Sequence, residues 1–246
     1  MITPIFGILI LICVMAVALT ERAGMKLGFF DYHAAIVVFG GVGGSLCIAI
    51  DSRSLRRMLQ SLRELLPGAT RFQREMRQTQ LGIVSMRSAW REGRRAEILE
   101  MADKGETEEL RVGADALLKQ LNGQTLSEKF TIVRTSYVHR FSPLIEGWDM
   151  VAKLAPSFGM VGTVTGMVQL FRNMGENSGN LGGAMAMALL ATLYGISLGA
   201  TVGGPMASRV NKQFNDRMAL LELLERTVAA LVEESSKYQP GGAKDS

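Results

Sequence analysis

Residues 154–171 read LAPSFGMVGTVTGMVQLF and contain no Asp, Glu, Lys, Arg or His. At about 1.5 Å of rise per residue, a helix of this length can cross a hydrocarbon core of about 30 Å. Pro156, Thr163 and several glycines interrupt the apolar residues, which is not typical of a purely lipid-facing helix. The stretch therefore predicts a transmembrane helix with a role beyond anchoring.

Three more apolar stretches, residues 2–19, 34–50 and 184–205, lie before and after this one. Each is long enough to span a membrane, and nearly all charged residues fall between or after them. The pattern predicts an all-α membrane protein with four transmembrane helices arranged as two hairpins. A basic face for nucleic acid is not expected, although the net charge is +4, because the basic residues flank apolar spans.

The distribution of Lys and Arg predicts the topology. The long segment 51–153 is rich in arginine and should be cytoplasmic, whereas residues 21–33 hold only Arg22 and Lys26 and should be periplasmic. The tail after Ser208 is also basic, so both termini are expected inside. The predicted organisation is a transmembrane hairpin at 1–50, a cytoplasmic helical domain at 51–153, a second hairpin at 154–205 and a cytoplasmic helical tail at 206–246.

Helix breaks inside the cytoplasmic segment are predicted near Pro67, Gly105, Gly123 and Pro143. The tail should form one packed helix, because its apolar residues recur at a spacing of mostly three or four. These residues are Val210, Phe214, Leu221, Leu224, Val228 and Leu231.

Glycines four residues apart occur in three of the spans. The pairs are Gly40 and Gly44, Gly162 and Gly166, and Gly195 and Gly199. Such spacing lets membrane helices approach backbone to backbone. The run 40–44, GGVGG, lies inside an apolar span without a strand-turn-helix context, so it predicts close packing rather than a nucleotide site.

None of the four spans has an ionisable residue in its interior. Such groups usually mark an ion path, so a proton channel made of this chain alone is not expected. Either the protein moves no ion, or a partner helix supplies the titratable carboxylate. No catalytic or metal-ligand cluster occurs, so an enzyme is not expected, nor is any cofactor or resident metal.

Pro156 has no backbone donor and would free the carbonyl of Ala152 if the helix extends back that far. A freed carbonyl at membrane depth is tolerated where it lines a wet cavity or is buried in protein. The alternative is that Pro156 only bends the helix and that the nearby hydroxyls bond to their own backbone. The residues by themselves leave both interpretations open.

Two segments resemble a known family. Residues 155–166, APSFGMVGTVTG, and 185–195, MAMALLATLYG, are similar to the third-span and fourth-span signatures of MotA/PomA flagellar stator subunits, within the MotA/TolQ/ExbB proton channel family. Gly182, the two-plus-two arrangement of spans and the long cytoplasmic loop also match. ExbB and TolQ relatives usually have three spans, which favours the MotA branch.

The resemblance implies a complex in the bacterial inner membrane. Five copies of this chain would form a ring around two MotB/PomB-like subunits, each with one membrane helix that bears an aspartate. Ion flow past that aspartate, alongside spans three and four, would turn the ring and push a FliG-like rotor protein. The implied ion-path residues are Pro156, Thr163, Ala191 and Thr192.

The resemblance also bears on the coupling ion. Thr163 and Thr192 match hydroxyl positions of sodium-driven relatives, which favours transient sodium binding there over a proton path. Ala191 stands where the sodium-type pattern often has a second threonine, so both ions stay open.

The family presents a basic residue and, about eight positions on, an acidic residue to the rotor. The candidate rotor-facing residues are Arg87, Arg91, Arg94, Arg95, Glu97 and Glu100. Aligned on Gly93, this sequence has Trp90 and Arg91 at the basic end but Ile98 at the acidic end. This departure leaves two alternatives to a flagellar stator: an ExbB/TolQ-like energiser of an outer-membrane or other non-flagellar system, and a membrane scaffold that conducts no ion.

Overall fold

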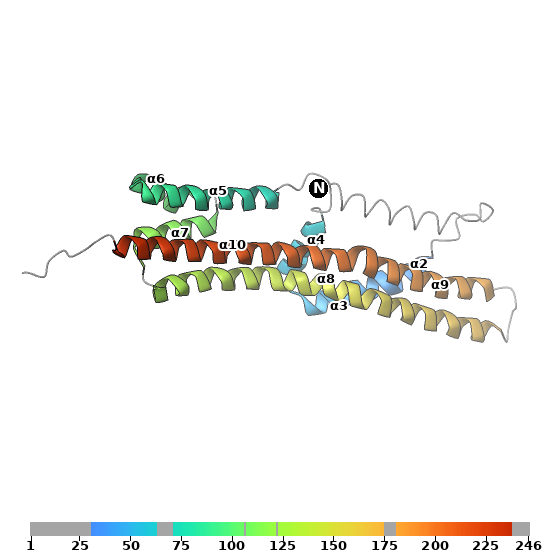
Figure 1. The fold of residues 1–246 in the computed structure, drawn as a ribbon. Coiled ribbons are helices and arrows are strands. Elements are labelled where there is room, and N and C mark those ends of the chain that lie inside the picture. The colour runs from blue at the N-terminus through green and yellow to red at the C-terminus, as the bar shows by residue number, and fades with distance from the viewer. Residues whose placement is uncertain (1–30, 63–70, 106, 122, 175–180, 238–246) are drawn as a thin grey trace, which may run out of the picture. The chain divides into compact units, whose positions relative to one another are not determined.

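The computed structural model describes residues 31–62, 71–105, 107–121, 123–174 and 181–237, and the regular elements in these ranges are all helical (Figure 1). One continuous helix comprises α2 (Tyr32–Ala35), the π-helical turn η1 (Ile36–Gly40) and α3 (Gly41–Ala49). It is followed by α4 (Ser52–Leu62), α5 (Arg71–Arg91), α6 (Arg95–Lys104), α7 (Glu108–Leu118) and α8 (Gly123–Asn173). A last continuous helix comprises α9 (Leu181–Ser197), the π-helical turn η4 (Leu198–Gly203) and α10 (Gly204–Lys237). The predicted all-α class is confirmed.

Three helical stretches within the described ranges are long and apolar enough to cross a membrane. They are Tyr32–Ala49, Gly123–Arg172 and Gly182–Ser236. These stretches contain the predicted spans 34–50, 154–171 and 184–205, apart from one residue at the end of the first. The remaining predicted span, 2–19, lies outside the described residues.

The chain divides into two compact units, and α8 and α10 each contribute to both. The first unit, here called the span unit, comprises residues Met1–Ala69 and Ser142–Asn211. The second, the loop unit, comprises Thr70–Phe141 and Lys212–Ser246. The loop unit therefore joins part of the long segment between spans two and three to the C-terminal tail.

The predicted helix break at Pro143 is wrong, because α8 runs without interruption through Pro143 and Pro156. A proline inside a helix removes one hydrogen bond, here to the carbonyl of His139, at a cost of about 3 kcal/mol or more. Tyr137 and Trp148 are buried on either side of Pro143, so the helical turns that flank the proline are each stabilised by packing within their own unit. The breaks predicted near Gly105 and Gly123 are confirmed, because α6 ends at Lys104 and α8 begins at Gly123. The break predicted near Pro67 lies outside the described residues.

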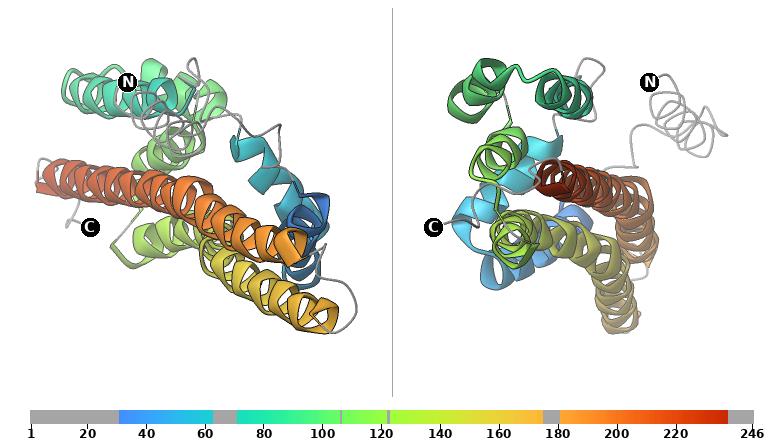
Figure 2. Two further views of the ribbon diagram at one scale, coloured as in Figure 1. Left: turned by 90° about the vertical axis from the view of Figure 1, so that its right-hand side faces the viewer. Right: turned by 60° about the vertical axis from the view of Figure 1, so that its left-hand side comes forward.

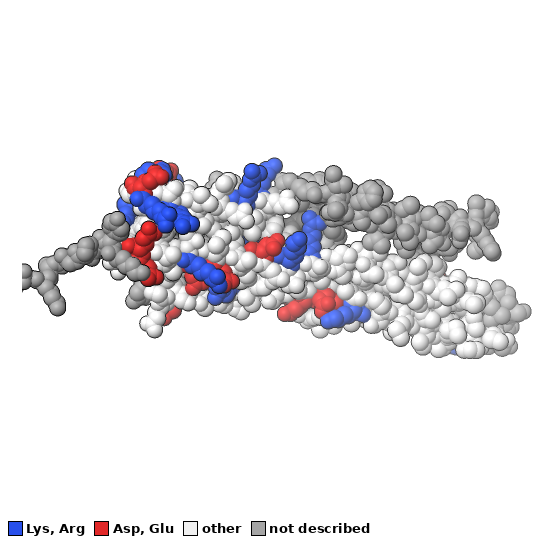
Figure 3. All heavy atoms as spheres, viewed as in Figure 1, with Lys and Arg blue, Asp and Glu red and all other residues white. Residues whose placement is uncertain are grey.

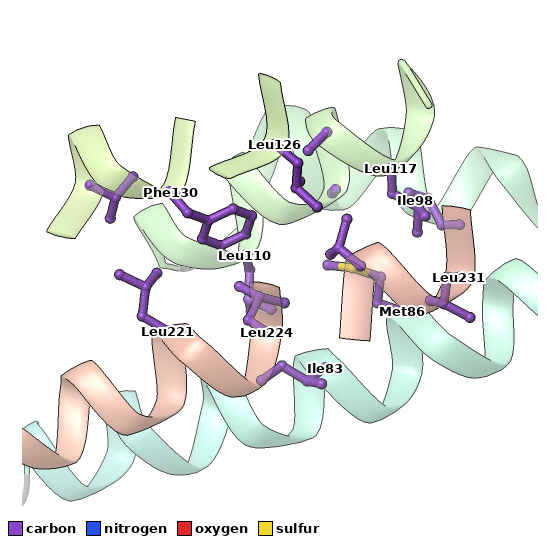
Figure 4. Packing of buried hydrophobic residues seen from close by; sticks show 14 of the residues in the cluster. Ile83, Met86, Ile98, Leu110, Leu117, Leu126, Phe130, Leu221, Leu224 and Leu231 are labelled. Atoms are coloured by element: carbon purple, nitrogen blue, oxygen red, sulfur yellow. The ribbon is translucent and has the colours of Figure 1, made fainter. Parts of the chain in front are cut away.

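The core of the loop unit is a cluster of buried apolar side chains from α5, α6, α7, α8 and α10 (Figure 4). Its fully buried members include Met86, Ile98, Leu117, Phe130, Leu221 and Leu224. Gly113 of α7 lets Leu224 approach, since an added Cβ would lie 3.1 Å from its Cδ1 atom. The predicted packing of the tail helix is confirmed, because Leu221, Leu224, Val228 and Leu231 are all buried.

In the span unit, the helix that contains α2 and α3 packs against α9. Ala34 and Val38 form a buried cluster with Met187, Leu190 and Ala191. Asp31 starts this helix, since its carboxylate accepts hydrogen bonds from the backbone N–H groups of His33 and Ala34. The second and fourth predicted spans are therefore in direct contact.

Candidate functional site

The candidate site lies where α9 and η4 run beside the second half of α8 (Figure 1 and Figure 2). Glycines line both sides of this contact, which we call the glycine seam: Gly159, Gly162 and Gly166 on α8, and Gly195, Gly199 and Gly203 on the facing helix. A Cβ added to Gly159 would lie 3.0 Å from the Ala191 carbonyl oxygen and 3.3 Å from the Cα atom of Gly195. The helices thus meet backbone to backbone, as predicted for these two spans.

The glycine pair of the second predicted span differs from the glycines of the seam in its exposure. Gly40 and Gly44 are exposed, and a Cβ added to Gly44 meets nothing within 4 Å among the described residues. The predicted close contact at Gly44 is therefore not made within the part of the chain that the structure describes.

Thr163 and Thr192 face each other across the seam, and their hydroxyl groups are hydrogen-bonded to one another. The Thr163 Oγ1 atom also lies 3.1 Å from the Gly159 carbonyl oxygen, and both hydroxyls lie 3.3 Å from the Ala188 carbonyl oxygen. The pair has two hydrogens, so one lies between the hydroxyls and the other is donated to a carbonyl. Lone pairs on the two threonine oxygens remain available to a cation.

Ala191 precedes Thr192 but occupies a different place. Its side chain is fully buried, and a Cβ on Gly162 would run into it. A larger side chain at this position would force the two helices apart. Ala191 is therefore part of the packing of the seam that holds the threonine pair together.

Pro156 lies at the same seam, closer to the start of the predicted third span. Because α8 extends back beyond Ala152, the Ala152 carbonyl would normally accept a hydrogen bond from the backbone N–H of residue 156. Pro156 has no such N–H, so this hydrogen bond is missing. Gly199 of η4 lies directly opposite: an added Cβ would be 2.8 Å from the Ala152 carbonyl oxygen and 2.9 Å from the Pro156 Cδ atom. Two irregular helix segments thus meet here, a proline on α8 and a π-helical turn on the facing helix.

The sequence predicts a packing role for Gly199 but does not predict its position opposite Pro156. The four-residue spacing of Gly195, Gly199 and Gly203 was the available signal, because it aligns one face of the helix with small residues. The π-helical turn itself has no residue signature. Such turns are rare and often occur at functional sites.

The seam provides hydroxyl and carbonyl oxygens but no titratable side chain. The visible face over α9 carries no Lys, Arg, Asp or Glu (Figure 3). The described residues of the predicted spans likewise contain none in their interiors. The arrangement can solvate a cation, but it cannot by itself bind and release a proton on a side chain.

The candidate rotor-facing residues lie around the turn between α5 and α6. Gly93 adopts a φ of 74°, a left-handed conformation that glycine adopts at little cost. The Arg94 N–H donates to the Ala89 carbonyl and the Gly93 N–H donates to the Trp90 carbonyl, which closes α5 with a Schellman motif. This turn fixes the direction in which α6 leaves α5.

The six predicted charged residues are all exposed, but most have partners within the loop unit. The Nη2 atom of Arg91 lies 3.3 Å from Glu234 Oε2, and Arg94 pairs with both Glu92 and Glu97. The guanidinium of Arg95 stacks 3.5 Å above the Trp90 ring. Arg87 and Glu100 have no ion pair among the described residues.

The structure explains the departure at the acidic end of this motif. Ile98 is 0% exposed and Trp90 is 7% exposed, and both belong to the core of the loop unit. Neither can present a side chain to a rotor. Arg91, the other residue predicted at the basic end, is exposed, and so is Glu97 beside Ile98.

These features define a multi-pass membrane protein with an oxygen-lined contact between two spans. A sequence model of the MotA/TolQ/ExbB proton channel family matches residues 101–223, half of the chain. The chain therefore belongs to the MotA/TolQ/ExbB proton channel family. Membership of a channel family supports the expectation that the protein is not an enzyme.

Part of the chain is also similar to a motility protein. The chain is 35% identical over 102 residues to motility protein A of Aquifex aeolicus, an alignment that covers 42% of this chain and 37% of that protein. It thus spans little more than a third of that relative's length.

Two solved structures share the fold. That of C. jejuni MotAB has a TM-score of 0.76 at 15% identity and covers 99% of this chain and 96% of that one. That of the flagellar MotAB stator complex from Bacillus subtilis has a TM-score of 0.70 at 20% identity and covers 93% and 89%.

Proposed function

We propose that this protein is the MotA-like subunit of an ion-driven stator, which couples ion flow across the inner membrane to rotation of a flagellar motor. The observation that carries the proposal is the glycine seam, where the Thr163 and Thr192 hydroxyls and the freed Ala152 carbonyl lie along one pair of spans without a titratable group. Such a path needs a carboxylate from another helix, which a MotB-like subunit with a membrane aspartate would provide. The family match and the motility relatives support it.

In this proposal five copies surround two MotB/PomB-like subunits, with both termini and the loop unit in the cytoplasm. The arginine-rich segment between spans two and three supports this orientation. The exposed apolar side chains of the span unit, such as Ile36, Val164 and Phe171, are available for lipid, for further copies and for the partner helix.

We propose sodium as the coupling ion. Sodium is a hard cation that must be surrounded by oxygen atoms as it sheds water, by the logic that governs other hard cations. The Thr163–Thr192 pair supports this proposal, because it would offer two hydroxyl oxygens to the ion next to the Ala188 carbonyl.

Replacing sodium by potassium at fixed pH is therefore expected to stop rotation in cells that express this chain with its partner. Thr163→Ala should raise the sodium concentration needed for half-maximal speed several-fold. Thr165→Ala is the matched control, because among the described residues the Thr165 hydroxyl bonds only to its own helix, 2.9 Å from the Val161 and Gly162 carbonyl oxygens. Rotation that persists without sodium but stops with a protonophore would show a proton path. The threonine pair would then have only a packing role.

We further propose that Arg87 and Arg91 steer the rotor, with Glu97 and Glu100 as the acidic contacts. Exposed interfacial charges mainly orient a partner, so Arg87→Glu and Arg91→Glu are expected to reduce torque and to be rescued by charge reversal on the rotor protein. Torque is measured by the rotation of tethered cells. Because Arg91 also pairs with Glu234, Glu234→Gln is the control for loss of the internal ion pair. Normal torque in both arginine variants at low ionic strength would remove these residues from the interface.

A second candidate function is an ExbB/TolQ-like energiser of a non-flagellar machine. One observation favours it: the residue at the expected acidic position, Ile98, is buried in the core. Motility restored by this chain in a strain that lacks its own stator would exclude this candidate.

A further inference from the structure

The short helix α4 directly follows the second predicted span. The helix α3 ends at Ala49, and α4 begins at Ser52, with Asp51 as its N-cap: the Asp51 carboxylate accepts a hydrogen bond of 3.2 Å from the Arg53 N–H. Three residues of chain reach at most about 10 Å, so the first turn of α4 lies close to the end of the span.

One face of α4 is fixed against α8 within the span unit. Met58 is buried, and a Cβ added to Gly147 would lie 2.8 Å from the Met58 Sδ atom and 2.7 Å from the Ile50 Cδ1 atom. The end of the span and the middle of α4 thus contact the same glycine. The Trp148 Nε1–H also donates a hydrogen bond of 3.1 Å to the buried Ser61 Oγ. The helix α4 is therefore held beside the end of the second predicted span, with a defined rotation about its axis.

The opposite surface of α4 is basic. Arg53, Arg56 and Arg57 are exposed and recur at the spacing of one helix face. None of the three has an ion pair or a side-chain hydrogen bond with a described residue. Three exposed cations without a partner among the described residues give this docked helix a surface that can bind an anionic ligand.

Apolar side chains next to this basic face indicate what kind of ligand it is. Leu59, three residues after Arg56, is 60% exposed, and Leu62 is partly exposed. Ile48, at the end of the adjoining span, is 90% exposed. A helix that combines basic residues with exposed leucines at the end of a span is typical of the membrane interface, where the leucines enter the acyl region and the arginines reach the headgroups.

We propose that Arg53, Arg56 and Arg57 form a binding site for the anionic headgroups of phospholipids in the cytoplasmic leaflet. The guanidinium groups bind the phosphates with charge-assisted hydrogen bonds, and Leu59 and Leu62 contact the acyl chains. The site selects phosphatidylglycerol over zwitterionic lipids around each copy of the chain. It rests on the proposed cytoplasmic orientation of the segment after the second span, but it does not depend on ion flow or on a rotor.

The test uses the full chain in its native assembly, reconstituted into nanodiscs with equal amounts of phosphatidylglycerol and phosphatidylcholine. Native mass spectrometry of the released assembly counts the lipids of each kind that stay bound. The triple variant Arg53→Gln, Arg56→Gln, Arg57→Gln is compared with a matched variant of the loop unit, Arg74→Gln, Arg77→Gln, Arg111→Gln, which loses the same charge from exposed positions.

Each basic residue near an anionic surface contributes about fivefold in affinity, so the α4 variant should lower the ratio of bound phosphatidylglycerol to phosphatidylcholine by at least about tenfold. The matched variant should leave the ratio unchanged. The triple lysine variant keeps the charge and should keep the preference, which separates an electrostatic effect from a packing defect. High salt should weaken the preference of the wild-type protein for phosphatidylglycerol.

Two results would overturn the proposal. One is an unchanged lipid ratio in the glutamine variant. The other is a loss of copies from the assembly with no change in lipid ratio, which would show that the three arginines bind a second copy of the chain.

Discussion

Replacing Arg217 by methionine is expected to lower the free energy of unfolding of the loop unit by about 3–5 kcal/mol, the range for breaking a buried ion pair. The Nη2 atom of Arg217 lies 2.6 Å from Glu75 Oε2, and its Nη1 atom lies 3.4 Å from Glu109 Oε1. The Glu109 side chain is only 5% exposed. Removing the guanidinium would leave this carboxylate buried without a cation.

Tyr137 cannot replace the lost charge. Its hydroxyl donates a hydrogen bond of 2.5 Å to Glu109 Oε1, and burial together with this carboxylate raises the pKa of Tyr137 above its ordinary value. The phenol therefore stays neutral at physiological pH and provides one hydrogen bond. A neutral donor compensates a buried carboxylate only in part.

Hydrogen exchange in the purified assembly measures the effect, because the amides of α5 and α7 report on the loop unit. Arg226→Met is the matched control: Arg226 pairs with Glu222 on the surface of the same helix, and losing an exposed pair should cost less than about 1 kcal/mol. Equal protection in the Arg217 and Arg226 variants would contradict a structural role for the buried cluster.

Pro156→Ala is expected to reduce ion flux and torque by at least about tenfold, which corresponds to about 1.4 kcal/mol in the barrier. The alanine N–H would donate to the Ala152 carbonyl and remove the free acceptor at the seam. It would also replace the ring that packs against Gly199. Since the helix regains a hydrogen bond, stability should rise or stay the same while function falls.

Proton or sodium flux into vesicles, measured together with the mass of the assembly, separates the two effects. Pro143→Ala is the matched control, because Pro143 also lies inside α8 but precedes the glycine seam. Flux should survive in the Pro143 variant. Unchanged flux in the Pro156 variant, or an equal loss in both, would leave Pro156 as a bend without a role in conduction.

Local patterns in the sequence were enough to predict much of the fold. The apolar lengths of residues 34–50, 154–171 and 184–205 predict spans because crossing a bilayer requires length and hydropathy, which are properties of a single segment. The spacing of Leu221, Leu224, Val228 and Leu231 predicts a packed tail helix because helical periodicity is equally local.

Patterns of this kind were less reliable at single residues. The break predicted at Pro143 is absent, since buried neighbours on both sides offset the missing hydrogen bond. Ile98, at the position where the motif has an acidic residue, is buried in the core of the loop unit, which a motif spacing does not reveal.

By itself, the sequence determined the all-helical class, three apolar spans of the described chain and the absence of a carboxylate within them. Only the tertiary structure decided that Thr163 and Thr192 hydrogen-bond to each other, that Ala191 packs against Gly162 and that a π-helical turn faces Pro156. The physical reason is the range of the interactions: hydropathy acts within one helix, whereas the partner of a hydroxyl or a freed carbonyl depends on how closely two helices approach, and here the glycines of both set that distance.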